Sequence, residues 1–231
     1  MTWTTAPLAA FDLETTGPEP LDARIVTACI VSGHRVGDLR PAGTNWLLDP
    51  EIEIPRGACA VHGVTTARAR AEGQDYAEGY REIRSTLETE WALGHVLAIY
   101  NAVYDLTIIN VEGLRLGYRP LIVGPVIDAF VVDRYLDKYR RGKRTLAVTC
   151  GHYGVRLDNA HSSDGDAYAA LELARSLART FRHDLEDITY AELMTVQAQW
   201  HKARQDSFRA YLQSSGKDGS GVCSDWPMRT A

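Results

Sequence analysis

Residues 8–17 constrain the fold of this chain more than any other stretch. The apolar residues Leu8, Ala9 and Ala10 lead directly into the sequence Phe11-Asp12-Leu13-Glu14-Thr15-Thr16-Gly17. Such a run is typical of a buried β-strand, and the Thr-Thr-Gly-Pro sequence that follows predicts a turn. Side chains alternate between the two faces of a strand, so Asp12 and Glu14 should point the same way, about 7 Å apart.

Two carboxylates on one face of a buried strand repel each other and are costly to desolvate. A fold tolerates such a pair when positive charge lies between them, and a hard divalent cation with oxygen ligands supplies that charge. The alternative is a strand that ends in a solvated polar turn. The remaining motifs decide between the two.

Length and charge limit the class of protein. With 231 residues, 45% of them hydrophobic, the chain can bury a full core, and we expect one domain with additions. A net charge of −5 argues against a broad electrostatic grip on duplex DNA. It does not exclude an enzyme that holds a few nucleotides in a metal-lined cleft, because the metals are themselves positive.

The cellular setting is also an expectation. The chain contains no run of about 18 apolar residues, which predicts no membrane span, and its N-terminus shows no signal peptide. The four cysteines are scattered without a Cys-x-x-Cys pair, so we expect neither a zinc site nor a disulfide framework. A cytoplasmic location follows as the default.

The pattern of apolar residues predicts an α/β fold. Strands at residues 24–32 and 44–48 would form an antiparallel meander with the first strand. Buried, parallel strands are expected at residues 95–100 and 123–127, and a loop with a short helical turn at residues 54–66. The expected helices span residues 74–91, 105–116, 129–137, 145–153, 164–182 and 190–212. The result is a sheet of mixed direction with helices on its faces.

Two further motifs place acidic residues at helix starts. Asp105 follows the strand ending at Asn101, and the carboxyl ends of such strands are where open α/β sheets bind ligands. The sequence His161-Ser-Ser-Asp-Gly-Asp166 puts an imidazole on a loop and a carboxylate on the next helix, with Asp164 expected as the helix cap. Taken singly, Asp105 and Asp166 could be helix-dipole partners and His161 a surface histidine.

Together these residues form a catalytic set. Four carboxylates and one histidine suffice for a phosphodiesterase with two metal ions. One ion would activate a water and the other would stabilise the leaving oxygen. The histidine would take the proton of the water, a task suited to an imidazole because it titrates near neutral pH.

The motifs resemble those of the DEDDh exonucleases, the family that includes the proofreading epsilon subunit of bacterial DNA polymerase III. The matching segments are residues 11–17, residues 101–105, His161 with Asp166, and Val61-His62-Gly63-Val64-Thr65. The resemblance implies a ribonuclease H-like fold and two Mg²⁺ or Mn²⁺ ions. Its catalytic set would be four metal-binding carboxylates and a general base: Asp12, Glu14, Asp105, Asp166 and His161.

The resemblance also implies contacts with the substrate. Leu13 and Thr16 should lie beside the terminal nucleotide, Val61 and His62 should line its base and sugar pocket, and Asn101 should contact substrate. Asp128 matches a recurrent acidic position, which we interpret as structural or as a support for the ligands.

The function predicted in this way is stepwise release of nucleoside 5′-monophosphates from DNA 3′ ends. Single-stranded 3′ ends are the expected partners, DNA is favoured over RNA, and a DNA polymerase is a possible partner. One alternative is a 3′–5′ exoribonuclease that trims RNA or short oligonucleotides, because the motifs are common to both groups. The other is a polymerase-associated accessory module with little activity.

The predicted organisation is an exonuclease domain at residues 1–182, a C-terminal helical extension at 183–213 and a linker-like tail at 214–231. Residues 134–144 carry six Lys or Arg, which suits either a phosphate-contacting surface or a solvated loop that offsets the acidic core. The helix at 190–212 is expected to pack on the domain rather than to bind a partner.

Overall fold

A mixed sheet of five strands forms the centre of the molecule, for which a computed structural model describes residues 2–34, 43–158 and 160–229. The strand order is β3-β2-β1-β4-β5. The first three strands are antiparallel, whereas β4 is parallel to β1 and β5 is parallel to β4. The strands are β1 Leu8–Thr15, β2 Ile25–His34, β3 Thr44–Leu47, β4 Val96–Ile99 and β5 Val126–Asp128. This confirms the predicted fold class. A turn was expected at residues 33–39, but β2 continues to His34, and the rest of that turn lies outside the described residues.

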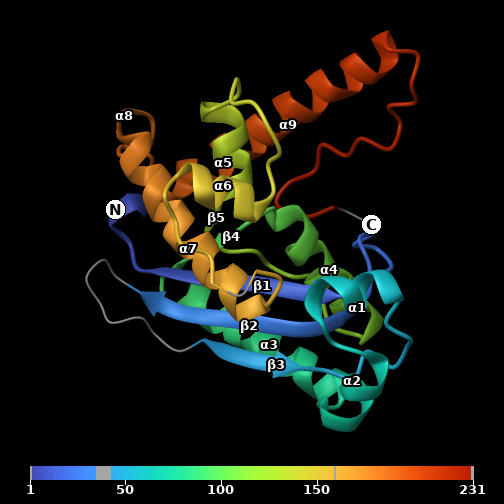
Figure 1. Ribbon diagram of the computed structural model, residues 1–231. Coiled ribbons are helices and arrows are strands. Elements are labelled where there is room, and N and C mark those ends of the chain that lie inside the picture. The colour runs from blue at the N-terminus through green and yellow to red at the C-terminus, as the bar shows by residue number, and fades with distance from the viewer. Residues whose placement is uncertain (1, 35–42, 159, 230–231) are drawn as a thin grey trace.

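Helices cover both faces of the sheet (Figure 1). One long helix, α7, packs across β1, β2 and β4, and α3 packs on the opposite face. A 3₁₀ turn, η1 Trp3–Thr5, precedes the first strand. The helices are α1 Arg56–His62, α2 Thr66–Glu72, α3 Tyr76–Ala92, α4 Ala102–Arg115, α5 Ala129–Leu136, α6 Leu146–His152, α7 Ser163–Thr180, α8 Arg182–Leu185 and α9 Tyr190–Ser214.

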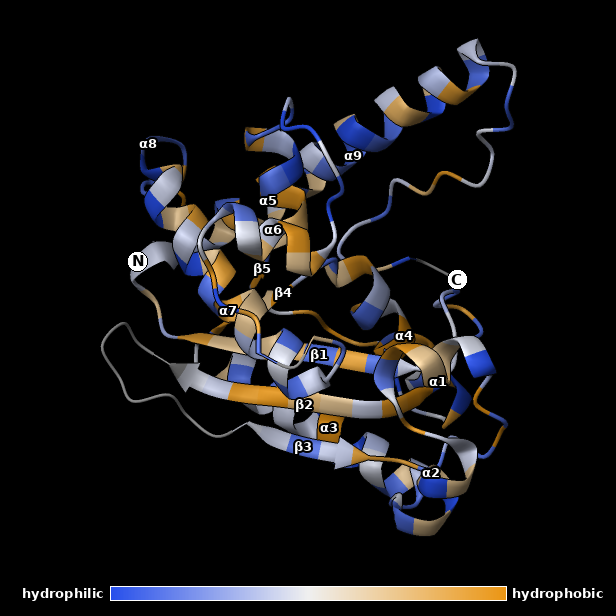
Figure 2. Cartoon of the chain, viewed as in Figure 1, coloured by the Kyte–Doolittle hydropathy of each residue, from blue (hydrophilic) through white to orange (hydrophobic). Residues whose placement is uncertain are grey.

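The strand β1 divides its side chains between two cores. Phe11 and Leu13 belong to the core beneath α3 and α4, whereas Leu8 and Ala10 belong to the core beneath α7. Figure 2 shows apolar residues along β1 and β2 at the centre of the molecule. Because strand side chains alternate, Asp12 and Glu14 continue the face of Leu8 and Ala10. Both carboxylates therefore point toward α7, the helix that carries Asp166.

Residues 54–66, predicted as a loop with a short helical turn, contain more helix than expected. Two short helices, α1 and α2, occupy this region and the residues after it. Gly63 ends α1 with a left-handed φ of 75°, and the Thr65 hydroxyl caps α2 by accepting the Arg68 N–H at 3.2 Å. Neither helix has apolar residues at helical spacing that would have predicted it, because α1 buries no residue and α2 buries only Ala69.

The starts of the two helices that carry Asp166 and Asp105 differ from expectation. Helix α7 begins at Ser163 with Ser162 at the cap position, so the expected cap, Asp164, lies in the first turn instead. Helix α4 begins three residues early, at Ala102. The Asp128 carboxylate accepts the backbone N–H groups of Asn101 and Ala102, each at 3.0 Å, and these bonds satisfy donors that a helix start leaves unpaired.

The C-terminal segment extends from the domain and returns to it. Helix α9 packs against α5, and its buried residues are Leu193 and Gln197, both in the first third of the helix. Its distal half projects from the body, and the tail then runs back toward α4 (Figure 1). Trp226 and Met228 pack against the core beneath α3 and α4, so the tail docks on the domain. In the part of the chain that is described, no helix is long and apolar enough to cross a membrane.

Candidate active site

Four carboxylates from three elements converge at one edge of the sheet. Asp12 and Glu14 lie on β1, Asp105 lies in the first turn of α4, and Asp166 lies in the first turn of α7. Burial, and then the charges of Asp105, Asp166 and Glu14, raise the pKa of Asp12 well above its usual range. Burial and Asp166 raise the pKa of Glu14 to about 7. The structure thus brings together the four carboxylates that the sequence predicted.

Asp105 is fixed by the strand beside it. Its side chain is 3% exposed, and its Oδ1 accepts the backbone N–H of Leu13 at 3.1 Å. Burial raises the pKa of Asp105 well above its usual range, and the Leu13 N–H opposes this rise. The parallel register of β1 and β4 brings the end of β4, and hence the start of α4, beside Asp12 and Leu13.

No lysine or arginine of the described residues forms an ion pair with any of these four carboxylates. In addition, Asp166 Oδ1 is buried without a hydrogen-bond partner among those residues. A buried polar atom without a partner costs about 1–3 kcal/mol, and more when it is charged. A set made of carboxylate oxygens is the kind of site that Mg²⁺ and Mn²⁺ prefer. The residues therefore fit divalent cations.

His161 lies at the mouth of this cluster. Its side chain is exposed and its backbone is left-handed, with a φ of 67°. Ligand atoms of Glu14, His161 and Asp166 lie within 4.8 Å of one another. Burial raises the pKa of Asp166, whereas the backbone N–H and the imidazole of His161 oppose that rise. The imidazole is thus beside the carboxylates and open to solvent.

A cavity of about 330 Å³ opens next to His161. Glu14 lines it from β1, and His62 lines it from the end of α1. Asn45, Trp46 and Arg68 also line it, and nothing in their sequence context predicted this, because they come from the edge strand β3 and from α2. The cavity therefore adjoins the carboxylates on the side of β2, β3 and α1.

Leu13 and Thr16, predicted to contact substrate, are both nearly buried. The Leu13 side chain is 5% exposed within the core, so the atom that it offers the site is its backbone N–H. The Thr16 hydroxyl accepts the backbone N–H of Arg24 at 2.9 Å, and the Thr16 N–H donates to the Arg24 carbonyl at 2.9 Å. These bonds fix the turn after β1.

The other predicted substrate contacts lie on both sides of the cluster. Val61 is 52% exposed on α1, and His62 lines the 330 Å³ cavity. Burial lowers the pKa of His62, and its Nδ1 accepts the Val64 N–H at 3.2 Å. Asn101, with a left-handed φ of 70°, precedes α4 and lines a different cavity, between α5 and α9.

Tyr104 is a residue whose role the sequence did not reveal. Its hydroxyl donates to the Gly17 carbonyl at 2.5 Å and is hydrogen-bonded to the Thr15 hydroxyl. It thereby ties the first turn of α4 to the turn after β1. An aromatic residue beside Asp105 is equally consistent with simple core packing, so its spacing gave no signal of this bridge.

Asp128 has the structural role that was expected of it. Besides the two N–H groups at the start of α4, its carboxylate accepts N–H groups from Phe130 at 3.0 Å, Val131 at 3.3 Å and the Trp226 indole at 3.2 Å. It therefore holds the starts of α4 and α5 and the docked tail together. The bond to Trp226 was not predictable from local spacing, because Trp226 lies 98 residues away.

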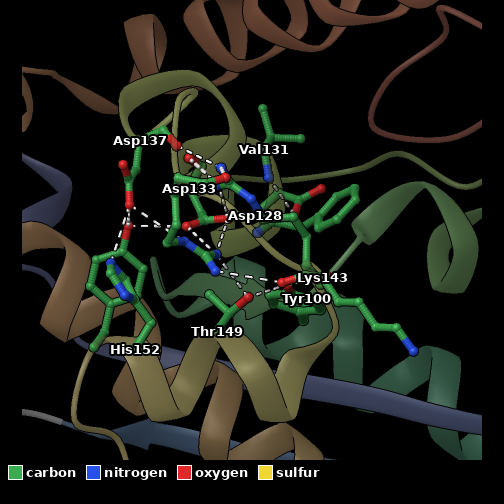
Figure 3. Close-up of polar contacts among 12 residues, drawn as sticks. Tyr100, Asp128, Val131, Asp133, Asp137, Lys143, Thr149 and His152 are labelled. Carbon is green, nitrogen blue, oxygen red and sulfur yellow. Dashed lines mark hydrogen bonds and ion pairs between the residues drawn. The ribbon is translucent and has the colours of Figure 1, made fainter.

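The basic run at residues 134–144 divides into two groups. Arg140 and Arg144 donate to the buried Asp133 carboxylate at 2.8 Å and 2.6 Å, and the Tyr153 hydroxyl donates to it at 3.0 Å. Figure 3 shows Asp133 and Asp137 within this network of polar contacts. These two arginines are internal structural groups. The remaining members, among them Arg134 and Lys138, form no ion pair with any described residue.

Comparison with known proteins gives consistent matches. The 24% identity over 178 residues to DNA polymerase III PolC-type of Clostridium perfringens covers 76% of this chain and 11% of that protein. The 30% identity over 170 residues to a DNA polymerase III subunit epsilon-like protein of Rhodobacter capsulatus covers 70% of this chain and 22% of that one. The chain thus spans less than a quarter of the length of these relatives.

Solved structures show the same fold. Escherichia coli exonuclease I in complex with a dA16 oligonucleotide superposes with a TM-score of 0.67 at 21% identity, covering 79% of this chain and 42% of that one. The zinc-bound exonuclease I–ssDNA complex gives 0.66 at 20% identity, with the same coverage. The family model described as Exonuclease, RNase_T, matches residues 9–174. This chain belongs to the RNase_T exonuclease family.

Proposed function

We propose that this protein is a metal-dependent 3′–5′ exonuclease that releases nucleoside 5′-monophosphates from the 3′ ends of single-stranded DNA. The observation that carries the proposal is the convergence of four carboxylates that lack a lysine or arginine partner among the described residues, beside an exposed histidine. Membership of the exonuclease family supports it. A site built only for stability would pair such charges internally.

Each residue has a task in this proposal. Asp12, Glu14, Asp105 and Asp166 hold two Mg²⁺ or Mn²⁺ ions, which supply charge neutralisation at the scissile phosphate and activation of water. His161 accepts the proton of the attacking water, and its exposure allows that proton to pass to solvent. The Leu13 N–H keeps Asp105 oriented.

The terminal nucleotide would lie beside the carboxylates. Its base and sugar would contact Leu13, Thr16, Val61 and His62, and the preceding nucleotide would pass Asn101. DNA is favoured over RNA because the two similar relatives are named as DNA polymerase III proteins and exonuclease I was solved with single-stranded DNA. Association with a DNA polymerase in the cytoplasm is part of the same proposal.

A paired nuclease assay tests the function. Single-stranded DNA and RNA of one sequence, labelled at the 5′ end, are incubated with Mg²⁺, with Mn²⁺ or with EDTA. We expect a ladder that shortens from the 3′ end, that forms faster on DNA, and that disappears in EDTA. Asp12→Ala should abolish it, whereas Asp22→Ala, which removes an exposed acid outside the site, should not.

The outcomes separate the candidate functions. Faster cleavage of RNA would make the protein an exoribonuclease. Cleavage that persists in Asp12→Ala would exclude the four-carboxylate site. A folded protein that binds single strands and cleaves neither would be an accessory module.

A further inference from the structure

Two adjoining cavities run between α5 and α9. Their volumes are about 390 and 670 Å³, and both are lined by Arg134, Tyr135, Trp200, Arg204 and Phe208. We call this continuous depression the α5–α9 groove. It lies outside the 330 Å³ cavity beside His161, with which it shares no lining residue.

The groove is rich in aromatic rings that solvent can reach. Tyr135 and Trp200 form a stacked pair, with ring centroids 4.6 Å apart and planes inclined by 11°. Further along the groove, Tyr139 is 86% exposed and Tyr211 is 60% exposed. Exposed rings of this kind are platforms on which unpaired bases stack, with little dependence on sequence.

The charge of the groove is entirely positive. Neither cavity has an Asp or Glu among its lining residues. Arg134, Lys138 and Arg204 each lie over an aromatic ring, and none forms an ion pair with a described residue. Burial, Arg204 and Arg144 lower the pKa of Arg134, so the guanidinium groups crowd one another. An anionic ligand would relieve that repulsion. This local surface contrasts with the net charge of −5.

The groove begins next to the four carboxylates of the candidate active site. Pro18, Asn101 and Tyr104 line its first cavity, and Asn101 and Tyr104 belong to the segment that ends in Asp105. From Trp200 to Tyr211 the wall formed by α9 is about 17 Å long, at 1.5 Å per residue. At about 3.4 Å per stacked nucleotide, this length accommodates roughly five nucleotides.

The tail of the chain completes the groove. Arg209 donates to the Val222 carbonyl at 2.7 Å and to the Ser224 hydroxyl at 3.1 Å, which ties the returning tail to the distal half of α9. Val222 and Cys223 then line the first cavity. The C-terminal segment, which extends beyond the family match at residues 9–174, therefore builds one wall and part of the rim.

We propose that the α5–α9 groove binds the single-stranded segment upstream of the 3′-terminal nucleotide, with bases stacked on its exposed rings and phosphates on Arg134, Lys138 and Arg204. The proposal rests on the proposed function, since it places the scissile end at the carboxylates. It assigns to the C-terminal segment a role in gripping long substrates.

Binding measured without catalysis tests the groove. Fluorescence anisotropy in EDTA compares a labelled oligothymidylate of about 12 nucleotides with one of about 3. Arg204→Glu and Tyr139→Ala should each weaken binding of the longer strand about tenfold, and that of the shorter strand less than about twofold. The control is Arg179→Glu, which reverses an exposed charge near the far end of α7 and should bind both strands like the wild type.

Several results would contradict the proposal that the α5–α9 groove binds single strands. One is unchanged binding of the longer strand in Arg204→Glu and Tyr139→Ala; another is a loss as large in Arg179→Glu. A duplex of the same length that binds as tightly as the single strand would also contradict stacking. Thermal melts identify any variant that does not fold, and Tyr211→Ala, at a second exposed ring, then replaces it. Metal-dependent cleavage of the shorter strand by the wild type is scored separately, so failure of the nuclease proposal is distinguishable from failure of the groove.

Discussion

Two sites in this molecule, the carboxylate of Asp133 and the four carboxylates around Asp12, accommodate negative charge in opposite ways. Asp133 is fully buried and receives donors from Arg140, Arg144 and Tyr153. The cluster around Asp12 brings four carboxylates together without a lysine or arginine from any described residue. The folded chain supplies all the donors that Asp133 needs, whereas the four carboxylates around Asp12 need positive charge from a bound cation.

The difference distinguishes a structural role for Asp133 from the catalytic role proposed for the cluster around Asp12. A buried ion pair that is fully satisfied fixes a local structure, and removing one partner is strongly destabilising. A cluster of carboxylates without positive partners destabilises the fold when its acids ionise. Such a cluster is therefore expected where a bound cation offsets its charge. Mutations should therefore separate the two groups, with activity lost at one and stability lost at the other.

Asp12→Asn should have the largest effect on activity and little effect on stability. It removes one metal ligand while keeping the side-chain volume, and the loss of several kcal/mol of transition-state stabilisation corresponds to about a thousandfold in kcat/KM. The melting temperature in EDTA should stay constant or rise, because a repulsive charge is gone. Nuclease assays and thermal melts, with Asp22→Asn as control, measure both. A large fall in melting temperature would show that Asp12 is a structural acid like Asp133.

His161→Gln should reduce the rate about 10²–10⁴-fold, the usual contribution of general acid–base catalysis. Metal binding should persist, because the four carboxylates are untouched. The measurement is kcat against pH, together with the rise in melting temperature on addition of Mn²⁺. Full activity in this variant would remove the assignment of His161 as the base. His183→Gln, at an exposed histidine of α8, is the matched control.

Asp133→Asn should reverse that pattern and cost about 3–5 kcal/mol of stability. It leaves the Arg144 side chain, which is 12% exposed, without a charge partner, and it leaves Arg140, which is 7% exposed, with Asp137 alone, whose Oδ2 lies 3.4 Å from the Arg140 Nε. For a domain of this size the melting temperature should fall by roughly 10 °C. Asp187→Asn, at an exposed acid, controls for the loss of charge alone. A stable Asp133→Asn variant would mean that the two groups do not differ in the way argued above.

Without metal, the melting temperature should depend on pH because the four clustered carboxylates titrate. Burial and Asp166 raise the pKa of Glu14 to about 7, and burial, Asp105, Asp166 and Glu14 raise the pKa of Asp12 well above its usual range. Protonation therefore favours the folded state: the stabilisation is present below about pH 4.5 and is lost as the pH rises through 7. Mg²⁺ binds the ionised carboxylates, so it should add several degrees at pH 8 and little at pH 5. Both effects should shrink in Asp12→Asn and persist in Asp22→Asn.

The sequence predicted the cluster of four carboxylates better than its surroundings. Strand alternation alone predicted that Asp12 and Glu14 share a face, whereas Asp105 and Asp166 were joined to them by the combination of motifs and by the resemblance to the DEDDh exonucleases. Local spacing could not show that Arg140 and Arg144 form ion pairs with Asp133, because a basic run has the same sequence pattern whether its side chains point into the protein or into solvent. Contacts between distant segments, such as α5 with α9, left no periodic signal.

Trp226→Phe should have the smallest effect of this series. Burial raises the pKa of Asp128, and the Trp226 indole N–H is the foremost group opposing that rise. Four backbone N–H groups remain on the carboxylate, so the loss of one bond at 3.2 Å should cost about 0.5–1.5 kcal/mol and a few degrees of melting temperature. Thermal melts measure it, with Trp226→Ala as the variant that also removes apolar packing. A loss of stability as large as that of Asp133→Asn would mean that one of the five donors to Asp128 decides whether this buried carboxylate is stable. The contrast between paired and unpaired carboxylates would then depend on the strongest donor rather than on the number of donors.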